Sequence, residues 1–270
     1  MFSLRKLLAD VNSDTSLIVK VRNIRYVLLW YVIQHLIEVK NRREKINILD
    51  VGGTPVFWRK FNELSLSKFN YPMLDNRNLN ISILNLTKFS SEERMGDNVD
   101  LITGDGLNIP FRDGVFDLVV CHSVIEHVGN FRNQKKLAHE IVRVSKCFFV
   151  QTPSYYIPLE PHFLIPYFQI LPRKIKVRIV MKTRKIEDYA AAEKVVDSIR
   201  LLKKPELLKM FPNSIILTEK LFFFPMSYIL IGGLSNSRNV MTNFYREINT
   251  DTNLRNTTKI FKFIVDQQTP

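Results

Sequence analysis

The sequence is poor in cysteine and glycine, and these shortages exclude several kinds of protein. Only 2 of the 270 residues are cysteines, Cys121 and Cys147. Both lie in runs that predict β-strands, so neither a disulfide framework nor a thiolate metal site is indicated, and we expect a reducing, cytoplasmic location and no metal ligands. The 9 glycines form no GxGxxG turn with an acidic residue about 20 positions later. That absence disfavours a nicotinamide-dependent dehydrogenase or epimerase.

Long apolar segments are also missing. The longest apolar run covers residues 26–33 and continues past Gln34 and His35 only to Ile37, well short of the roughly 20 residues that cross a bilayer. The opening stretch MFSLRKLLADVNSD reaches polar residues before any sustained apolar run, so it does not predict a signal peptide. We therefore expect no spanning helix.

The composition favours one globular domain with anionic partners. The chain is 46% hydrophobic and carries a formal net charge of +13. Such a chain buries a substantial core, and its positive potential attracts nucleic acid, acidic lipid or a phosphorylated substrate. No zinc-finger, leucine-zipper or RNP signature is present, so no nucleic-acid partner is expected.

Hydrophobic periodicity predicts a helix followed by alternating strands and helices. Apolar residues recur at spacings of four and three over residues 17–39, which predicts a helix within a basic N-terminal arm, residues 1–45. Short apolar runs then predict strands at 46–51, 81–86, 100–103, 116–122 and 147–151, and helices are predicted at 56–67 and 133–144. This alternation indicates a parallel sheet with helices on both faces.

The residue composition changes after Thr152. Five prolines are interspersed with aromatic residues between 153 and 172, which indicates a compact loop over one end of the sheet. The basic stretch 174–185 fits a strand and a helix equally. Helices are predicted at 186–202 and 205–210, strands at 214–221 and 227–232, and one further helix near 240–248 in an otherwise polar tail.

The turn after the first predicted strand, ILDVGGTPVFW, has the features of an anion site. Gly52 and Gly53 interrupt the strand, Thr54 is a good N-cap residue, and Pro55 is tolerated in the first helical turn. Backbone N–H groups and the helix dipole would then face a ligand at the sheet edge. Taken alone, a two-glycine turn is equally compatible with a connection that binds nothing.

A longer segment carries a family resemblance. The stretch GDGLNIPFRDGVFDLVVCHSVIEHV, followed by VQTPSYYIPLEPHF and LLKKPELLKMFPNSIILTEKL, resembles class I S-adenosylmethionine-dependent methyltransferases, in the branch with small-molecule acceptors. The resemblance extends from about residue 47 to residue 233. It implies a Rossmann-like class I methyltransferase fold over residues 46–233, with a lid or insertion at 152–200 and a polar tail at 234–270.

The same resemblance implies the cofactor, S-adenosyl-L-methionine, and its contacts. The methionine end would lie at the turn, the ribose at the end of the second strand, and the adenine just past the third. The corresponding residues are Asp50, Gly52, Gly53 and Thr54 for the methionine end, Asn85 for the ribose, and Asp105, Gly106 and Leu107 for the adenine. Asp50 and Asp105 each have a second interpretation, as a cap on their own loop. The chain departs from the family at Thr54 and Val56, where small residues are usual, and at Asn85, where an acid is usual.

The predicted reaction centre follows the fourth strand. The resemblance places His122 against the cofactor there, with Glu126 and His127 beside it. An uncharged oxygen acceptor needs a base, and His127 and His162 are the candidates, while Glu126 either assists or pairs locally. The aromatic segment 155–168 is either an acceptor lid or core. The resemblance implies a small-molecule or lipid- or sugar-linked acceptor.

Two hypotheses concern partners. The basic stretch 173–185 and the first helix either face solvent or contact an anionic membrane or a phosphorylated acceptor. The missing glycines and Asn85 also allow a degenerate methyltransferase fold that serves as a binding or membrane-associated scaffold.

Overall fold

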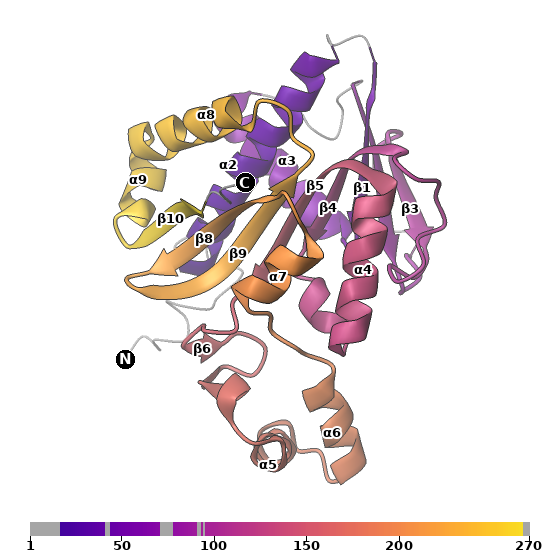
Figure 1. The fold of residues 1–270 in the computed structure, drawn as a ribbon, viewed down its shortest axis with the longest axis vertical. Coiled ribbons are helices and arrows are strands. Elements are labelled where there is room, and N and C mark those ends of the chain that lie inside the picture. The colour runs from indigo at the N-terminus through magenta and orange to yellow at the C-terminus, as the bar shows by residue number, and fades with distance from the viewer. Residues whose placement is uncertain (1–16, 41–43, 71–77, 91–92, 94, 267–270) are drawn as a thin grey trace.

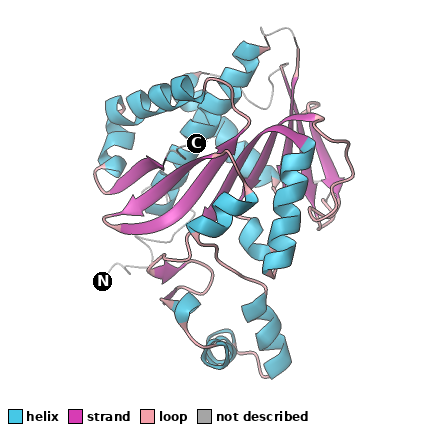
Figure 2. Cartoon of the chain, viewed as in Figure 1, coloured by secondary structure: helices cyan, strands magenta, loops and turns pink. Residues whose placement is uncertain are grey.

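The chain is built around one eight-stranded sheet with helices on both faces (Figures 1 and 2). The computed structural model describes residues 17–40, 44–70, 78–90, 93 and 95–266. The strands of the sheet are β1 (Ile46–Val51), β2 (Leu79–Asn85), β3 (Val99–Thr103), β4 (Phe116–His122), β5 (Ser145–Pro153), β8 (Ile215–Leu221), β9 (Phe224–Gly232) and β10 (Phe261–Asp266). Residues 1–16 and 41–43 of the predicted arm lie outside the described residues.

The strand order is β10-β8-β9-β5-β4-β1-β2-β3. β1 to β5 are parallel to one another, whereas β9 is antiparallel to both β5 and β8, and β10 is antiparallel to β8. The connections leave β1 in one direction toward β2 and β3, and in the other toward β4 and β5. In a doubly wound sheet, a ligand crevice forms outside the carboxyl ends of the strands where this order reverses. Here that point lies between β1 and β4.

Each face of the sheet carries its own hydrophobic core. One face is covered by α2 (Leu17–Val39), α3 (Pro55–Phe69), α8 (Ser237–Thr250) and α9 (Thr252–Thr258). The other is covered by α4 (Phe131–Val144) and α7 (Lys204–Met210), which lie in front of the sheet in Figure 1. Residues of β4 from Phe116 to Cys121 are all buried, because a central parallel strand is covered on both sides.

Residues after β5 form a small unit below the sheet in Figure 1. It contains β6 (Leu159–Glu160), β7 (Ile165–Pro166), the 3₁₀ turn η3 (Phe168–Ile170), α5 (Arg173–Arg184) and α6 (Tyr189–Asp197). The stretch that fitted both strand and helix is helix α5, because Val177 and Val180 bury against Ala192 and Val196 of α6. Arg173 at the start of α5 is paired with Asp197 at the end of α6.

The predicted elements agree with the structure in type and order, with two corrections. The helix predicted at 186–202 is only α6, which starts where the Asp188 side chain accepts hydrogen bonds from the N–H groups of Ala190 and Ala191. The predicted polar tail contains more than one helix, since α9 and β10 follow α8. Phe261 and Phe263, two alternate residues of β10, are buried in the same core as residues of α8. None of the helices in the described residues is long and apolar enough to cross a membrane.

Candidate functional site

The turn between β1 and α3 is shaped by close packing within the protein. Gly52 has a positive φ of 72°, and its N–H donates to the carbonyl of Leu84 at 2.7 Å. A Cβ on Gly52 would lie 2.6 Å from Val124, and one on Gly53 would lie 1.8 Å from the Asp50 carboxylate. Thr54 occupies the N-cap position of α3 with extended backbone, as expected, although its side chain makes no cap hydrogen bond. Pro55 opens the helix as expected.

Asp50 lies beneath this turn rather than at its surface. It is 1% exposed, and Trp58 Nε1–H donates to its Oδ2 at 2.8 Å. Burial raises the pKa of Asp50 to about 7, an effect that the Trp58 hydrogen bond only partly offsets. Asp50 therefore supports the loop from below, and Trp58, the residue least expected in such a turn, is the reason that a carboxyl is tolerated there.

Asn85 closes the turn from the side. Its Nδ2 donates to the carbonyl of Gly53 at 2.9 Å, and its Oδ1 accepts from the N–H of Thr87 at 3.2 Å. These two partners fix the orientation of the amide, since one requires a donor and the other an acceptor. A carboxylate at this position could satisfy Thr87 but not Gly53, which explains why an acid is absent here.

Asp105 follows β3 and is exposed. Its Oδ1 accepts from the N–H of Leu107 at 2.8 Å, which is the loop-capping contact. Gly106 lies against the core, because a Cβ there would meet Val51 at 3.0 Å and Leu137 at 3.2 Å.

These residues surround a cavity of about 280 Å³ at the carboxyl ends of β1 to β4. Its lining comes from the turn, from the ends of β2 and β3, and from the segment after β4. The lining residues are Val51, Gly52, Leu84, Asn85, Leu86, Gly104, Asp105, Gly106, Ser123, Val124, His127, Val128 and Leu137. Gly53, Thr54, Leu107 and His122 are not among them. The cavity lies at the point where the strand order reverses, and most of its surface is apolar.

His122 ends β4 and faces away from this cavity. Its ring lies 5.4 Å from that of Phe57 on α3, and its Nε2 is buried without a hydrogen-bond partner among the described residues. Burial, together with the positive charge of Arg25, lowers the pKa of His122 to about 3. The wall of the cavity after β4 is formed instead by Ser123 and Val124.

Glu126, His127 and His162 come together, although 35 positions separate the two histidines. Glu126 and His127 lie in the 3₁₀ turn η2 (Ile125–His127), and His162 follows β6. The two Nε2 atoms are 3.1 Å apart, and one possible ligand atom from each of the three residues lies within 4.8 Å of the other two. The sequence placed these residues at the reaction centre, and the structure brings them together at the rim of the cavity, which His127 also lines.

The surroundings of this cluster hold its members differently. Glu126 is fully buried, and burial raises its pKa to about 7. The Thr152 hydroxyl donates to Glu126 Oε2 at 2.9 Å, whereas Glu126 Oε1 has no hydrogen-bond partner among the described residues. His162 Nδ1 lies 2.6 Å from Glu160 Oε1. His127 is exposed at the surface, although partial burial lowers its pKa.

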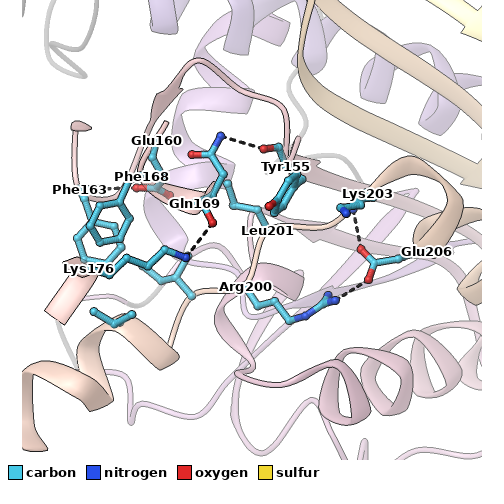
Figure 3. Close-up of a pocket in the computed structure, with 12 residues that line it drawn as sticks. Tyr155, Glu160, Phe163, Phe168, Gln169, Lys176, Arg200, Leu201, Lys203 and Glu206 are labelled. Carbon is cyan, nitrogen blue, oxygen red and sulfur yellow. Dashed lines mark hydrogen bonds and ion pairs between the residues drawn. The ribbon is translucent and has the colours of Figure 1, made fainter. Parts of the chain in front are cut away.

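A second cavity, of about 260 Å³, lies between the small unit and the segment 199–206, which leads into α7 (Figure 3). Tyr155, Gln169 and Lys176 line one part of it, and Arg200 and Glu206 line another. Glu160 also lines this cavity, so the residue that holds His162 connects the cavity to the histidine pair.

Three residues that hold the site were missed from the sequence. Gln134 donates to the carbonyls of Ile125 and Arg200, and the N–H of Arg200 donates to the carbonyl of Glu126 at 2.9 Å. Glu160 stood in the quoted LEPH stretch, and this motif was the only signal available for it. Nothing in the sequence marks Gln134 or Arg200, because each is distant in the chain from the contacts it makes.

The strand order, with a buried antiparallel strand between the fifth strand and the edge, defines a Rossmann-like class I methyltransferase fold. The cavity at the switch point occupies the place where open α/β sheets bind ligands. Residues 74–147 match the family model for a methyltransferase domain, which covers less than half of the chain.

Solved structures with similarity to the chain carry methyltransferase names. One is a SAM-dependent methyltransferase from Methanosarcina mazei, at 13% identity over 70% of this chain and 92% of that chain, with a TM-score of 0.40. Another is a possible histamine N-methyltransferase from Thermotoga maritima, at 13% identity over 76% and 90%, with a TM-score of 0.41. A third is magnesium protoporphyrin IX methyltransferase from Synechocystis PCC 6803 with bound SAH, at 10% identity over 78% and 80%, with a TM-score of 0.44.

Proposed function

We propose that the protein is an S-adenosylmethionine-dependent methyltransferase that binds its cofactor in the 280 Å³ cavity. The observation that carries the proposal is the position of this cavity. It lies at the carboxyl ends of β1 to β4, where the order of the sheet reverses, and beside the N-terminus of α3. The methyltransferase family model matches residues 74–147, which include β2, β3 and β4.

The residues present fit such a cofactor. Apolar side chains of Leu84, Val124 and Leu137 line the cavity and suit the faces of a purine ring. Gly106 leaves space in the cavity, because a side chain there would contact Val51 and Leu137. In this proposal Asp105 accepts from the adenine amino group, Asn85 Oδ1 faces the ribose, and the N–H groups at the start of α3 hold the methionine carboxylate.

The cofactor supplies an electrophilic methyl group, and the chain's task is to orient the acceptor and exclude water. Glu126, His127 and His162 lie together beside the cavity, which His127 lines, and in this proposal they bind or deprotonate the acceptor. The second cavity borders Glu160, which contacts His162, so we propose that the acceptor enters from that side. Its lining carries three basic side chains, Lys176, Arg200 and Lys203, against two acidic ones, Glu160 and Glu206, and Arg200 is paired with Glu206. The small positive excess, together with the apolar side chains, suits a small anionic molecule or a phosphate- or sugar-linked one.

Calorimetry with S-adenosylmethionine, its demethylated product and NAD tests the proposal. We expect heat from the first two ligands and none from NAD. Asp105→Asn should weaken cofactor binding about 10-fold or more, because the amide loses the charge but still accepts from Leu107 N–H. Asp100→Asn is the matched control, since Asp100 is exposed near the opposite end of β3. Equal affinity of the two variants for S-adenosylmethionine would contradict the proposed contact between Asp105 and the adenine.

The second candidate function is a degenerate fold that binds no cofactor. It is favoured by the way the polar groups of the cavity already bond within the chain, since Asn85 bridges Gly53 and Thr87 and Asp105 bonds Leu107. Absence of heat with both methionine-derived ligands, from a protein that melts cooperatively, would favour this alternative.

Contact with an anionic membrane remains part of the proposal only for α5. The buried residues of α2 pack against the sheet, whereas α5 exposes Lys174, Arg178 and Lys182. Sedimentation with vesicles at low salt would test it, and equal binding to acidic and neutral lipid would exclude it.

A further inference from the structure

The cluster of Glu126, His127 and His162 has an unusual feature, an orphaned carboxylate oxygen. Glu126 is 0% exposed, and its Oε1 has no hydrogen-bond partner among the described residues. A buried carboxylate oxygen without a hydrogen bond is costly, and no side chain of the described residues supplies a partner for this one. One carboxylate oxygen of Glu126 and one ring nitrogen of each of the two histidines lie within 4.8 Å of one another.

The histidine pair is arranged as metal ligands are. Their Nε2 atoms face one another at 3.1 Å. In a tetrahedral zinc site with bonds of about 2.0–2.1 Å, ligand atoms lie roughly 3.3 Å apart. Two imidazoles and one carboxylate form a ligand set found in catalytic zinc sites, where the fourth position is left for water or substrate.

Glu160 prepares His162 for this role. Glu160 is 1% exposed, its Oε1 lies 2.6 Å from His162 Nδ1, and its Oε2 accepts from the N–H groups of His162 and Phe163. A carboxylate beside Nδ1 favours the tautomer with the proton on that nitrogen, so that the Nε2 lone pair faces His127 Nε2, 3.1 Å away, where the ion would enter between the two rings. This carboxylate–histidine pairing is the usual outer contact of a histidine bound to metal.

We propose that Glu126, His127 and His162 bind one divalent transition-metal ion, with zinc the best match to the ligand types. The ligands of the ion would come from η2 and from the loop after β6, so the ion would connect the small unit to the rim of the cavity. Its open position would take an oxygen donor, either water or an acceptor. The acceptor role rests on the proposed methyltransferase function, whereas metal binding does not.

The test uses the full-length, untagged protein, stripped of metal with chelator and titrated with Zn²⁺ by calorimetry and with Co²⁺ by visible absorption. We expect one ion per chain and the intense bands of tetrahedral cobalt. Glu126→Gln keeps the shape of the side chain and can still accept from Thr152, so it should fold and yet bind zinc about 100-fold more weakly or worse. His162→Ala should behave likewise, and Glu160→Gln should lose about 10- to 100-fold.

His139→Ala is the matched control, because His139 is exposed on α4 and is not a member of the cluster. Absence of a stoichiometric ion from the wild-type protein would overturn the proposal, as would a Glu126→Gln variant that melts like the wild type and binds zinc equally well. Calorimetry with S-adenosylmethionine on metal-free protein separates the two proposals. Cofactor heat without zinc binding would leave the methyltransferase standing and remove the metal site, and zinc binding without cofactor heat would do the reverse.

Discussion

Replacing Asp50 by asparagine should stabilise the folded protein at neutral pH. Burial raises the pKa of Asp50 from 3.8 to about 7. Since each tenfold change in a dissociation constant corresponds to about 1.4 kcal/mol, ionising Asp50 in the folded chain costs about 4 kcal/mol relative to the unfolded chain. Asparagine carries no such cost, and its oxygen can still accept from Trp58 Nε1–H.

The direction of the pH dependence follows from the raised pKa. Below about pH 4 the carboxyl is protonated in both states, and its contribution is fully present. Between about pH 4 and about pH 7 the unfolded chain releases the proton while the folded chain keeps it, so the stability of the wild-type protein falls as the pH rises. Above that window the loss is complete. The gain from Asp50→Asn should therefore grow from near zero to about 4 kcal/mol over this range.

Urea denaturation at a series of pH values, followed by tryptophan fluorescence, measures this difference. The two curves of unfolding free energy against pH should diverge across the window, and parallel curves would refute the reasoning. Asp117→Asn is a control for which we expect a pH dependence of the opposite sign. Although burial acts to raise the pKa of Asp117, hydrogen bonds from Lys40, Asn47 N–H and Lys146 lower it below its ordinary value. Its contribution is present above that value and lost in acid, so this variant should lose stability at neutral pH.

Three further predictions follow from the same packing. Asn85→Asp should lower the unfolding free energy by about 1–3 kcal/mol, because its carboxylate would face the carbonyl of Gly53, and a melting temperature equal to that of the wild type would contradict the assigned amide orientation. Arg25→Ala should cost about 3–5 kcal/mol by leaving the fully buried Glu219 unpaired, while Arg25→Met with Glu219→Leu should recover most of this loss in urea melts. Gly52→Ala should lower the unfolding free energy by about 2–4 kcal/mol, because an alanine there has a positive φ and its Cβ would contact Val124. Gly114→Ala is the control, since Gly114 has a φ of 61° but open space around it, and this variant should lose only about 1–2 kcal/mol. Equal losses of stability in thermal melts would exclude the contact with Val124.

The sequence was a sound guide to the order of elements because local periodicity reports burial. The helix at residues 17–39 and the strands at 46–51 and 116–122 agree with α2, β1 and β4. The sequence could not decide whether residues 174–185 form a strand or a helix, because their apolar residues fit both periods. The choice depends on which of these residues are covered, and the covering element, α6, is a separate segment of the chain. β10 was missed for the same reason, since a short edge strand near charged residues becomes evident only when β8 is beside it.

The site shows the same division. The glycine turn was singled out from its own residues, and Asp105 and the two histidines from the family resemblance, and all of them lie in or beside the candidate site. Their chemistry was not, because the orientation of a side chain depends on contacts distant in sequence. Asp50 faces Trp58 beneath the turn, Asn85 is held by the carbonyl of Gly53, and His122 lies against Phe57, outside the lining of the cavity.

By itself, then, the sequence determined the strand-helix alternation and the residue types at the edge of the sheet, because hydrophobic period and turn chemistry act over a few neighbouring positions. Only the tertiary structure decided that His127 and His162 meet, that Glu126 is buried beside them with one oxygen that no described residue bonds, and that Glu160 holds His162 in place. These contacts join the turn after β4 to the loop after β6. Closing that distance requires the folded sheet and the small unit below it.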